Sequence, residues 1–105
     1  MCGFAGVYHD GACDNNHIKL TLKRMNDTLI PRGPEEEGFF FDNKIALSHR
    51  RLKIIDLSQN ASQPMQLSKN GPVIVFNGEI YNFLEIKNFL ISKGYSFFSK
   101  SDLLN

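Results

Sequence analysis

The residue after the initiating methionine offers the clearest chemistry in this chain. Cys2 follows Met1 directly and precedes Gly3. If Met1 is removed, Cys2 becomes the first residue and carries both a thiol and a free α-amine. An α-amine is partly unprotonated near neutral pH, so it can accept the thiol proton and activate the sulfur as a nucleophile. By itself this start is a weak signal, because any protein can carry a small second residue and a lone cysteine defines no site without partners.

A metal site is the competing use of the cysteines. Cys2, His9, Cys13 and His17 lie close together in the sequence, and all four could bind a soft metal. Their spacing matches none of the usual paired zinc patterns, and His17 falls at the start of an expected helix. We therefore expect no metal here. Without a secretion signal, we also expect both cysteines to be reduced thiols.

Four further motifs follow in order along the chain. They are Arg32-Gly33-Pro34-Glu35, Ser48-His49-Arg50-Arg51-Leu52-Lys53-Ile54-Ile55-Asp56, Asn77-Gly78-Glu79-Ile80-Tyr81-Asn82 and Ser101-Asp102. A strand that ends in Asn77-Gly78 can aim a side-chain amide and an unhindered backbone N–H at one point, which suits an oxyanion. The same pair is also the strongest short signal for a hairpin turn, and its local sequence alone favours the hairpin.

Together, the Met-Cys-Gly start and these motifs resemble the glutamine-hydrolysing domain of class-II amidotransferases. These are N-terminal-nucleophile hydrolases with a first-residue cysteine. The resemblance extends from Met1 to Asp102, and the motif wording is most similar to the asparagine synthetase branch. It implies that Cys2 attacks the side-chain amide of glutamine, with its own α-amine as the base. A γ-glutamyl thioester would form, ammonia would leave, and an acceptor such as aspartate or a related acid would receive it.

The resemblance also implies roles for the other site residues. It assigns Asn77 and Gly78 to the oxyanion hole, Arg51 to the substrate carboxylate, and Glu79 and Asp102 to the substrate ammonium. Further members of the implied site are Ile54 and Ile55 in the substrate loop and Arg32 and Gly33 in a supporting turn.

Some charged residues near these motifs have a plainer interpretation. Arg50 and Arg51 could be solvated strand residues and Glu79 a surface charge, as most charges in small proteins are. Arg50 has no counterpart role in the resemblance. His49 is a rival general base, which we expect to be structural because the amine mechanism needs no imidazole. Glu35 stands where the family usually has Asp, so it is left out of the site.

Hydrophobic patterning predicts the elements that position these residues. We expect a buried central strand at 2–8, an amphipathic helix at about 16–29 capped by Asn15-Asn16, and a charged turn at 32–38 in which Gly33 has a positive φ. Strands are expected at 39–41, 44–48 and 73–76, with an extended stretch at 52–55 and a loop at 58–72. A helix should run from a capping box at Asn82 and Glu85 to Gly94, followed by a strand at 95–98. This order predicts an α+β fold, and the resemblance implies part of a four-layer αββα sandwich.

Composition limits the other possibilities. The 105 residues are 42% hydrophobic and 22% charged with a net charge of +1, as in a globular domain. No basic cluster indicates a nucleic-acid partner, and no apolar run is long enough for a membrane span. We expect a cytoplasmic protein.

The extent of the resemblance predicts an incomplete enzyme. Residues 1–105 match only the N-terminal part of a type-2 amidotransferase domain. No Ser-Gly-Gly pyrophosphate loop occurs, so the ATP- and magnesium-dependent synthetase half is expected elsewhere, in cis or on a separate chain. Leu103-Leu104-Asn105 departs from the family's Thr-Glu and long helix, as in a truncated, frameshifted or split gene product. We expect the isolated chain to have little activity.

Uncovered strands in such a piece favour association, including a homodimer. The alternative to a catalytic piece is a non-catalytic remnant or an interaction module.

Overall fold

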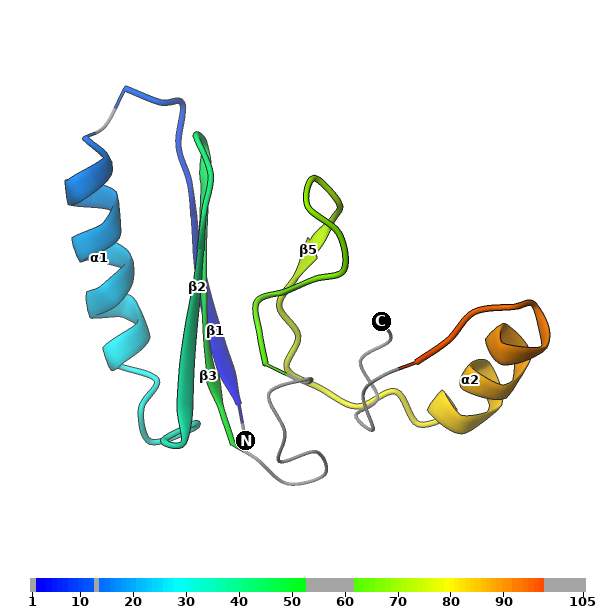
Figure 1. Cartoon of the computed structure of the whole chain (residues 1–105). Helices are drawn as coiled ribbons and strands as arrows, with labels where there is room; N and C mark the ends of the chain where they lie inside the picture. Colours follow the sequence, from blue (N-terminus) through cyan, green and yellow to red (C-terminus); the bar gives the residue numbers. More distant parts are fainter. Residues whose placement is uncertain (1, 13, 53–61, 98–105) are drawn as a thin grey trace.

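The computed structural model describes residues 2–12, 14–52 and 62–97 (Figure 1). Within these residues the chain forms, in order, β1 (Gly3–Tyr8), α1 (Asn15–Asp27), β2 (Glu36–Phe41), β3 (Ile45–Arg51), β4 (Met65–Gln66), β5 (Val73–Ile74) and α2 (Phe83–Ser92). Helices and antiparallel strands are both present, which confirms the α+β class. No helix of the described part is long and apolar enough to cross a bilayer.

A three-stranded antiparallel sheet forms the body of the described structure. Its strand order is β1-β3-β2, with Gly3 opposite Arg50 and Glu37 also opposite Arg50. β3 is therefore the central strand, and the expectation that β1 is central is wrong for the described residues. β1 lies at an edge because β3 uses its two edges for β1 and β2.

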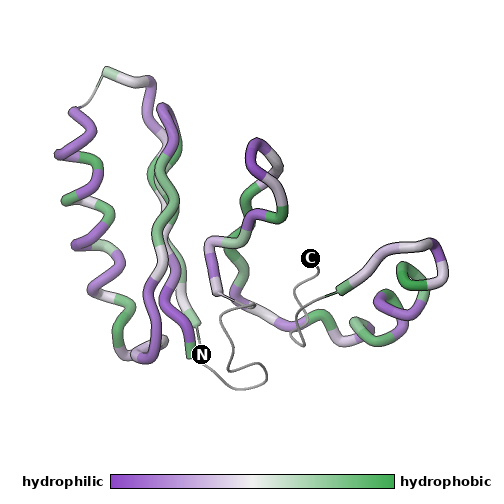
Figure 2. Tube along the Cα trace, in the orientation of Figure 1, coloured by the Kyte–Doolittle hydropathy of each residue, from purple (hydrophilic) through white to green (hydrophobic). Residues whose placement is uncertain are grey.

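Helix α1 covers one face of this sheet (Figure 1). Its apolar side chains recur on one face of the helix, and Figure 2 shows the resulting alternation of hydrophobic and hydrophilic residues. Ile18 and Leu22 pack with Ala46 of β3 to form the core. The helix is capped by Asp14, whose carboxylate accepts a hydrogen bond from the Asn16 N–H at 3.1 Å, and not by Asn15-Asn16.

Charge pairing extends the strands beyond the expected positions. β2 begins at Glu36 and β3 continues to Arg51, so part of the expected charged turn at 32–38 is strand. Glu36 and Glu37 lie opposite Arg51 and Arg50 in the antiparallel register. Opposite charges across a strand pair stabilise the pairing, which explains why two acidic residues belong to a strand.

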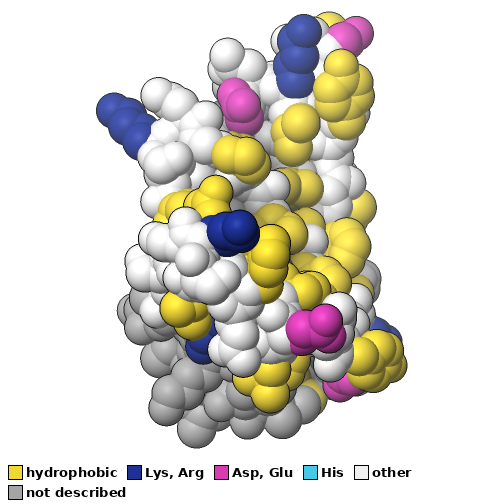
Figure 3. Space-filling view, turned by 90° about the vertical axis from the view of Figure 1, so that its right-hand side faces the viewer, with side chains coloured by type: hydrophobic (Ala, Val, Ile, Leu, Met, Phe, Trp, Pro, Cys, Tyr) yellow, Lys and Arg dark blue, Asp and Glu magenta, His cyan; other side chains and the backbone are white. Residues whose placement is uncertain are grey.

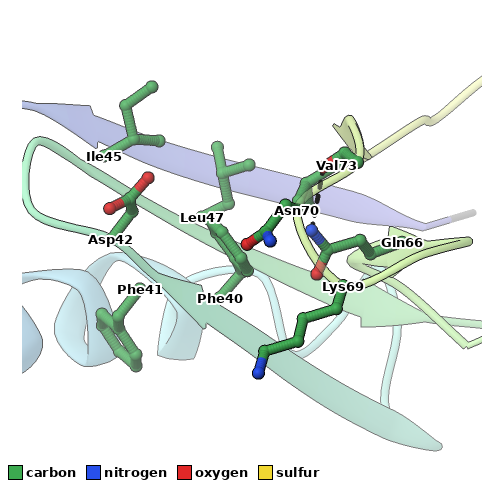
Figure 4. Close-up of a pocket in the computed structure, with 10 residues that line it drawn as sticks. Phe40, Phe41, Asp42, Ile45, Leu47, Gln66, Lys69, Asn70 and Val73 are labelled. Carbon is green, nitrogen blue, oxygen red and sulfur yellow. Dashed lines mark hydrogen bonds between the residues drawn. The ribbon is translucent and has the colours of Figure 1, made fainter.

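The other face of the sheet meets the β4–β5 strand pair. Phe40 and Leu47 point toward this pair and line a cavity of about 540 Å³ with Gln66 and Asn70, whereas Phe41 points the other way (Figure 4). β4 lies inside the stretch that was expected to be a loop, and β5 covers only half of the expected strand at 73–76. Strands of two residues are too short to give a periodic signal.

The C-terminal part of the described chain is largely exposed. Helix α2 has no buried residue, and its Asn82 cap makes no side-chain hydrogen bond, so the expected capping box does not form. Residues 95–97 form no strand, and residue 98 lies outside the described residues. Figure 3 shows hydrophobic side chains spread over this side of the molecule. The large exposed ones here include Tyr81, Leu84, Phe89, Ile91 and Tyr95.

Candidate active site

Cys2 precedes β1 and lies against the end of β3. Its Sγ accepts a hydrogen bond from the Leu52 N–H at 3.3 Å and lies 3.8 Å from the Leu52 carbonyl oxygen. The residue is half-buried and its thiol is free. The thiol is thus held at one end of the sheet.

The adjacent arginines Arg50 and Arg51 lie on opposite faces of the sheet. Successive side chains of a strand alternate between faces. Arg50 contacts the turn at Gly33 and Pro34, on the side of α1, so Arg51 lies on the other side. Continuing the register by one residue puts Cys2 level with Arg51, on that same other side. Sequence adjacency therefore conceals two different environments.

Both arginines are buried, at 8% and 5% exposure for Arg50 and Arg51, so their interpretation as solvated strand residues is wrong. The Arg51 Nη1 lies 3.4 Å from the Glu36 Oε2. A buried guanidinium retains its charge and needs an acidic partner, which β2 provides. Arg51 is consequently a fixed cation on the thiol's face of the sheet.

The turn after α1 contacts Cys2 directly. The Arg32 Nε donates a hydrogen bond to the Cys2 carbonyl oxygen at 3.0 Å. Gly33 is buried, and a Cβ built on it would lie 2.5 Å from the Arg50 carbonyl oxygen and 2.6 Å from the Arg51 nitrogen. Its φ is not positive, since the positive-φ glycines of the described residues are Gly11 and Gly94. Gly33 is needed for close backbone approach, and the expected positive φ is wrong.

Gly33→Ala should destabilise the fold by about 3 kcal/mol, because the added methyl group overlaps backbone atoms of β3 that cannot rotate away. Urea unfolding of the two proteins measures this difference. Gly11→Ala is the matched control: its φ is 90°, but a Cβ there meets no atom within 4 Å. We expect the control to lose only about 1 kcal/mol, from the unfavourable φ alone. Equal losses in the two variants would contradict the steric explanation.

His49 joins the central strand to the segment before the Asn-Gly motif. Its exposure is 1%, and its Nε2 lies 3.3 Å from the Phe76 carbonyl oxygen. Burial lowers the pKa of the imidazole, and the Phe76 carbonyl, which raises it, compensates only in part. A buried neutral imidazole bonded to the backbone supports the structural role expected for His49.

The lowered pKa of His49 predicts a pH-dependent stability. As the pH falls through the ordinary value of 6.5, the unfolded chain gains a proton that the folded chain does not bind. The free energy of unfolding should therefore decrease between about pH 7.5 and about pH 5.5. Urea titrations at both pH values measure the slope, which His49→Gln should flatten. A slope that persists in His49→Gln would contradict the assignment.

The Asn-Gly motif connects β5 to α2. The Phe76 N–H donates to the Gln63 Oε1 at 2.6 Å, so the backbone before Asn77 is held on both its N–H and its carbonyl side. Asn77 is half-buried, whereas Gly78 and Glu79 are exposed. The next element is a helix and not a returning strand, so the hairpin interpretation is wrong.

Ile54, Ile55 and Asp102 lie outside the described residues, as does Cys13. No group of three or more potential metal ligands converges within the described ranges. The cavity at Phe40 and Leu47 is formed with the opposite end of β3 from Cys2, and none of the predicted site residues lines it.

Sequence reasoning missed Arg50 and Glu37. Arg50 Nε donates to the Gly33 carbonyl oxygen at 2.8 Å, and its Nη1 lies 3.0 Å from the Glu37 Oε2. The available signal was the pair of acidic residues at 36–37 and the pair of basic residues at 50–51. Once β2 is known to begin at Glu36, the two pairs face each other in register.

Comparison with known proteins shows which family the chain belongs to. The family model of a glutamine amidotransferase domain matches residues 1–103. A glutamine-hydrolysing asparagine synthetase of Bacillus subtilis is 41% identical over 104 residues, covering 97% of this chain and 16% of the relative. One of Brassica oleracea is 33% identical over 103 residues, covering 97% and 17%. An amidase of Gibberella zeae is 33% identical over 112 residues, covering 97% and 16%.

The chain belongs to the glutamine amidotransferase domain family, a family of enzyme domains, because the family model covers nearly its whole length. It spans about a sixth of the length of the relatives that it matches.

Proposed function

We propose that this chain is the part of a glutamine-dependent amidotransferase that hydrolyses glutamine, with Cys2 as the nucleophile. The observation that carries the proposal is the half-buried free thiol of Cys2 beside the end of β3, on the sheet face that also holds the buried Arg51. Membership of the glutamine amidotransferase domain family supports the choice of glutamine as substrate.

In the proposed reaction, removal of Met1 frees the α-amine of Cys2. That amine accepts the thiol proton while sulfur attacks the side-chain carbonyl carbon of glutamine. The tetrahedral intermediate collapses, the carbon–nitrogen bond breaks, and the amine passes the proton to the leaving ammonia. Water then adds to the γ-glutamyl thioester, which releases glutamate and restores the thiol. The net reaction is glutamine plus water to glutamate plus ammonia.

Recognition of the whole amino acid requires charges of both signs. Arg51 is proposed to bind the substrate carboxylate, because a guanidinium can engage both of its oxygens. Its burial supports this role, since the charge acts in a site of low dielectric. Glu79 and Asp102 are proposed for the substrate ammonium, and Ile54 and Ile55 for the substrate loop. Asn77 and Gly78 are proposed as the oxyanion donors.

The ammonia is proposed to amidate an acid, aspartate or a related carboxylate, in a synthetase domain that uses ATP and magnesium. Two of the relatives are named glutamine-hydrolysing asparagine synthetases, which supports aspartate, whereas another is named an amidase. The choice of acceptor rests on these names. Residues 1–105 are proposed to form the N-terminal part of an amidotransferase domain with a four-layer sandwich fold. The protein is proposed to be cytoplasmic.

Labelling by a glutamine-like diazoketone tests the proposal. Intact mass of the protein at its natural length should show loss of Met1 and one covalent adduct, located at Cys2 by peptide mapping. Excess glutamine should protect Cys2 from the label. An excess of a glutamine analogue that lacks the α-carboxylate should not protect it. Retained Met1 with no adduct would overturn the enzymatic assignment and favour the non-catalytic remnant or interaction module.

A further inference from the structure

Arg50 is a buried cation that the proposed reaction leaves without a role. All the polar contacts of its guanidinium point to the α1 side of the sheet, away from the proposed substrate. The Nε donates to the Gly33 carbonyl oxygen at 2.8 Å, and the Nη2 donates to the Pro34 carbonyl oxygen at 3.4 Å. Two of its nitrogens therefore hold successive carbonyls of one turn.

The charge of Arg50 is balanced by Glu37, which is itself fixed by α1. Nη1 of Arg50 lies 3.0 Å from Glu37 Oε2, and the same oxygen accepts a hydrogen bond from Asn26 Nδ2 at 3.1 Å. Asn26 is fully buried, and Lys23 adds a second cation 3.1 Å from the carboxylate. Burial raises the pKa of Glu37, but the hydrogen bonds and charges of Lys23 and Arg50 outweigh it and lower the pKa overall. Glu37 is thus held ionised.

The turn that Arg50 holds also carries the residue that contacts the nucleophile. Arg32 Nε donates to the Cys2 carbonyl oxygen at 3.0 Å, and Gly33 follows directly. The turn is also bonded to the residues that directly follow α1, with the Gly33 N–H 3.2 Å from the Leu29 carbonyl oxygen. A continuous series of contacts therefore connects α1, through Glu37, Arg50 and the turn, to Cys2.

We propose that Arg50 is a positioning residue, which fixes the Gly33-Pro34 turn so that Arg32 holds the Cys2 carbonyl and orients the nucleophile. This inference rests on the proposed function. The planar fork of arginine suits the role because it binds a carboxylate and two carbonyls in fixed directions, whereas a lysine ammonium is a single point charge. Lysine keeps the charge opposite Glu37 but cannot keep both turn contacts.

A double-mutant cycle between Arg50→Lys and Arg32→Ala tests the proposal in the protein at its natural length. Two rates are measured: kcat/KM for glutamine hydrolysis, and the rate of Cys2 alkylation by iodoacetamide, followed by intact mass. In the wild-type background, Arg50→Lys should lower kcat/KM about tenfold through kcat, with KM within about twofold, since small displacements of a reacting group have large effects. In the Arg32→Ala background, Arg50→Lys should change both rates by less than about twofold.

Two further variants keep the test decisive. Glu37→Gln should lower kcat about threefold, because it weakens the anchor of Arg50, and this loss should also vanish in the Arg32→Ala background. If the Arg50→Lys protein does not fold, Glu37→Gln takes its place in the cycle. Arg24→Gln removes an exposed arginine of α1 and should change neither rate. Equal losses in both backgrounds, or no loss in the wild-type background, would overturn the positioning role.

The two proposals fail differently. Absence of glutamine hydrolysis by the wild-type protein overturns the proposed function. Cys2 alkylation does not require glutamine hydrolysis. If Arg50→Lys changes the alkylation rate equally in the wild-type and Arg32→Ala backgrounds, the role of Arg50 is overturned even if glutamine is hydrolysed.

Discussion

Cys2→Ala is expected to lower glutamine hydrolysis by more than about 10³-fold, to the background rate, because the sulfur is the protein atom proposed to form the covalent bond to the substrate. A coupled assay for glutamate measures the loss in the protein at its natural length. The free energy of unfolding should change little, since the thiol is half-buried and its hydrogen bond to Leu52 involves a weakly accepting sulfur. The variant therefore separates chemistry from folding.

A second variant separates the thiol from the amine. Insertion of one alanine between Met1 and Cys2 keeps the thiol but converts its α-amine into an amide, which cannot act as a base. We expect hydrolysis to fall to the background rate here as well. Lys69→Ala, in the cavity at the other end of the sheet, is the control and should retain full activity. Full hydrolysis by either the alanine variant or the insertion variant would refute the mechanism.

Asn77→Ala is expected to lower kcat by about 10²- to 10³-fold, the usual effect of removing one oxyanion donor. The KM for glutamine should remain within a few-fold, because the donor binds the charge that develops in the transition state and not the ground-state amide. Steady-state kinetics with glutamine measure both constants. The backbone around Asn77 should be retained, because Phe76 is held by His49 and Gln63 and not by the Asn77 side chain.

The matched control for this prediction is Asn70→Ala, which truncates an exposed asparagine in the loop between β4 and β5. It should leave kcat unchanged. An increase in KM with unchanged kcat for Asn77→Ala would show that the amide binds substrate and does not stabilise the oxyanion.

Part of the fold could be predicted because its residues repeat with a simple period. The α1 region shows apolar residues at helical spacing, and the structure places Ile18 and Leu22 in the core as that spacing requires. The strands expected at 39–41 and 44–48 are present as β2 and β3, but both are longer in the structure. Their extensions are residues 36–38 of β2 and 49–51 of β3, and four of these six residues are charged, which hides a strand from any hydrophobic pattern.

The candidate site was only partly predictable. Cys2, Arg32, Gly33, Arg51 and Asn77 were identified from motif order, and the structure brings the first four together at one end of the sheet. Arg50 was left out of the site because the resemblance gave it no counterpart role, and its sequence neighbours do not show that it contacts Gly33 and Glu37. The reason for Gly33 was also misjudged, since contact with β3 across 17 positions determines it and local turn geometry does not.

The sequence alone determined the types of reactive group in this chain and their order, together with the helix and strands whose period is strong enough to read. The tertiary structure alone decided which groups meet. Because side chains alternate along a strand, Arg50 lies on the α1 face of the sheet and Arg51 on the face of Cys2. The antiparallel register places Glu37 opposite Arg50 and Glu36 opposite Arg51. Register and burial depend on residues far apart in the chain, so no local pattern could have specified the environment of either charge.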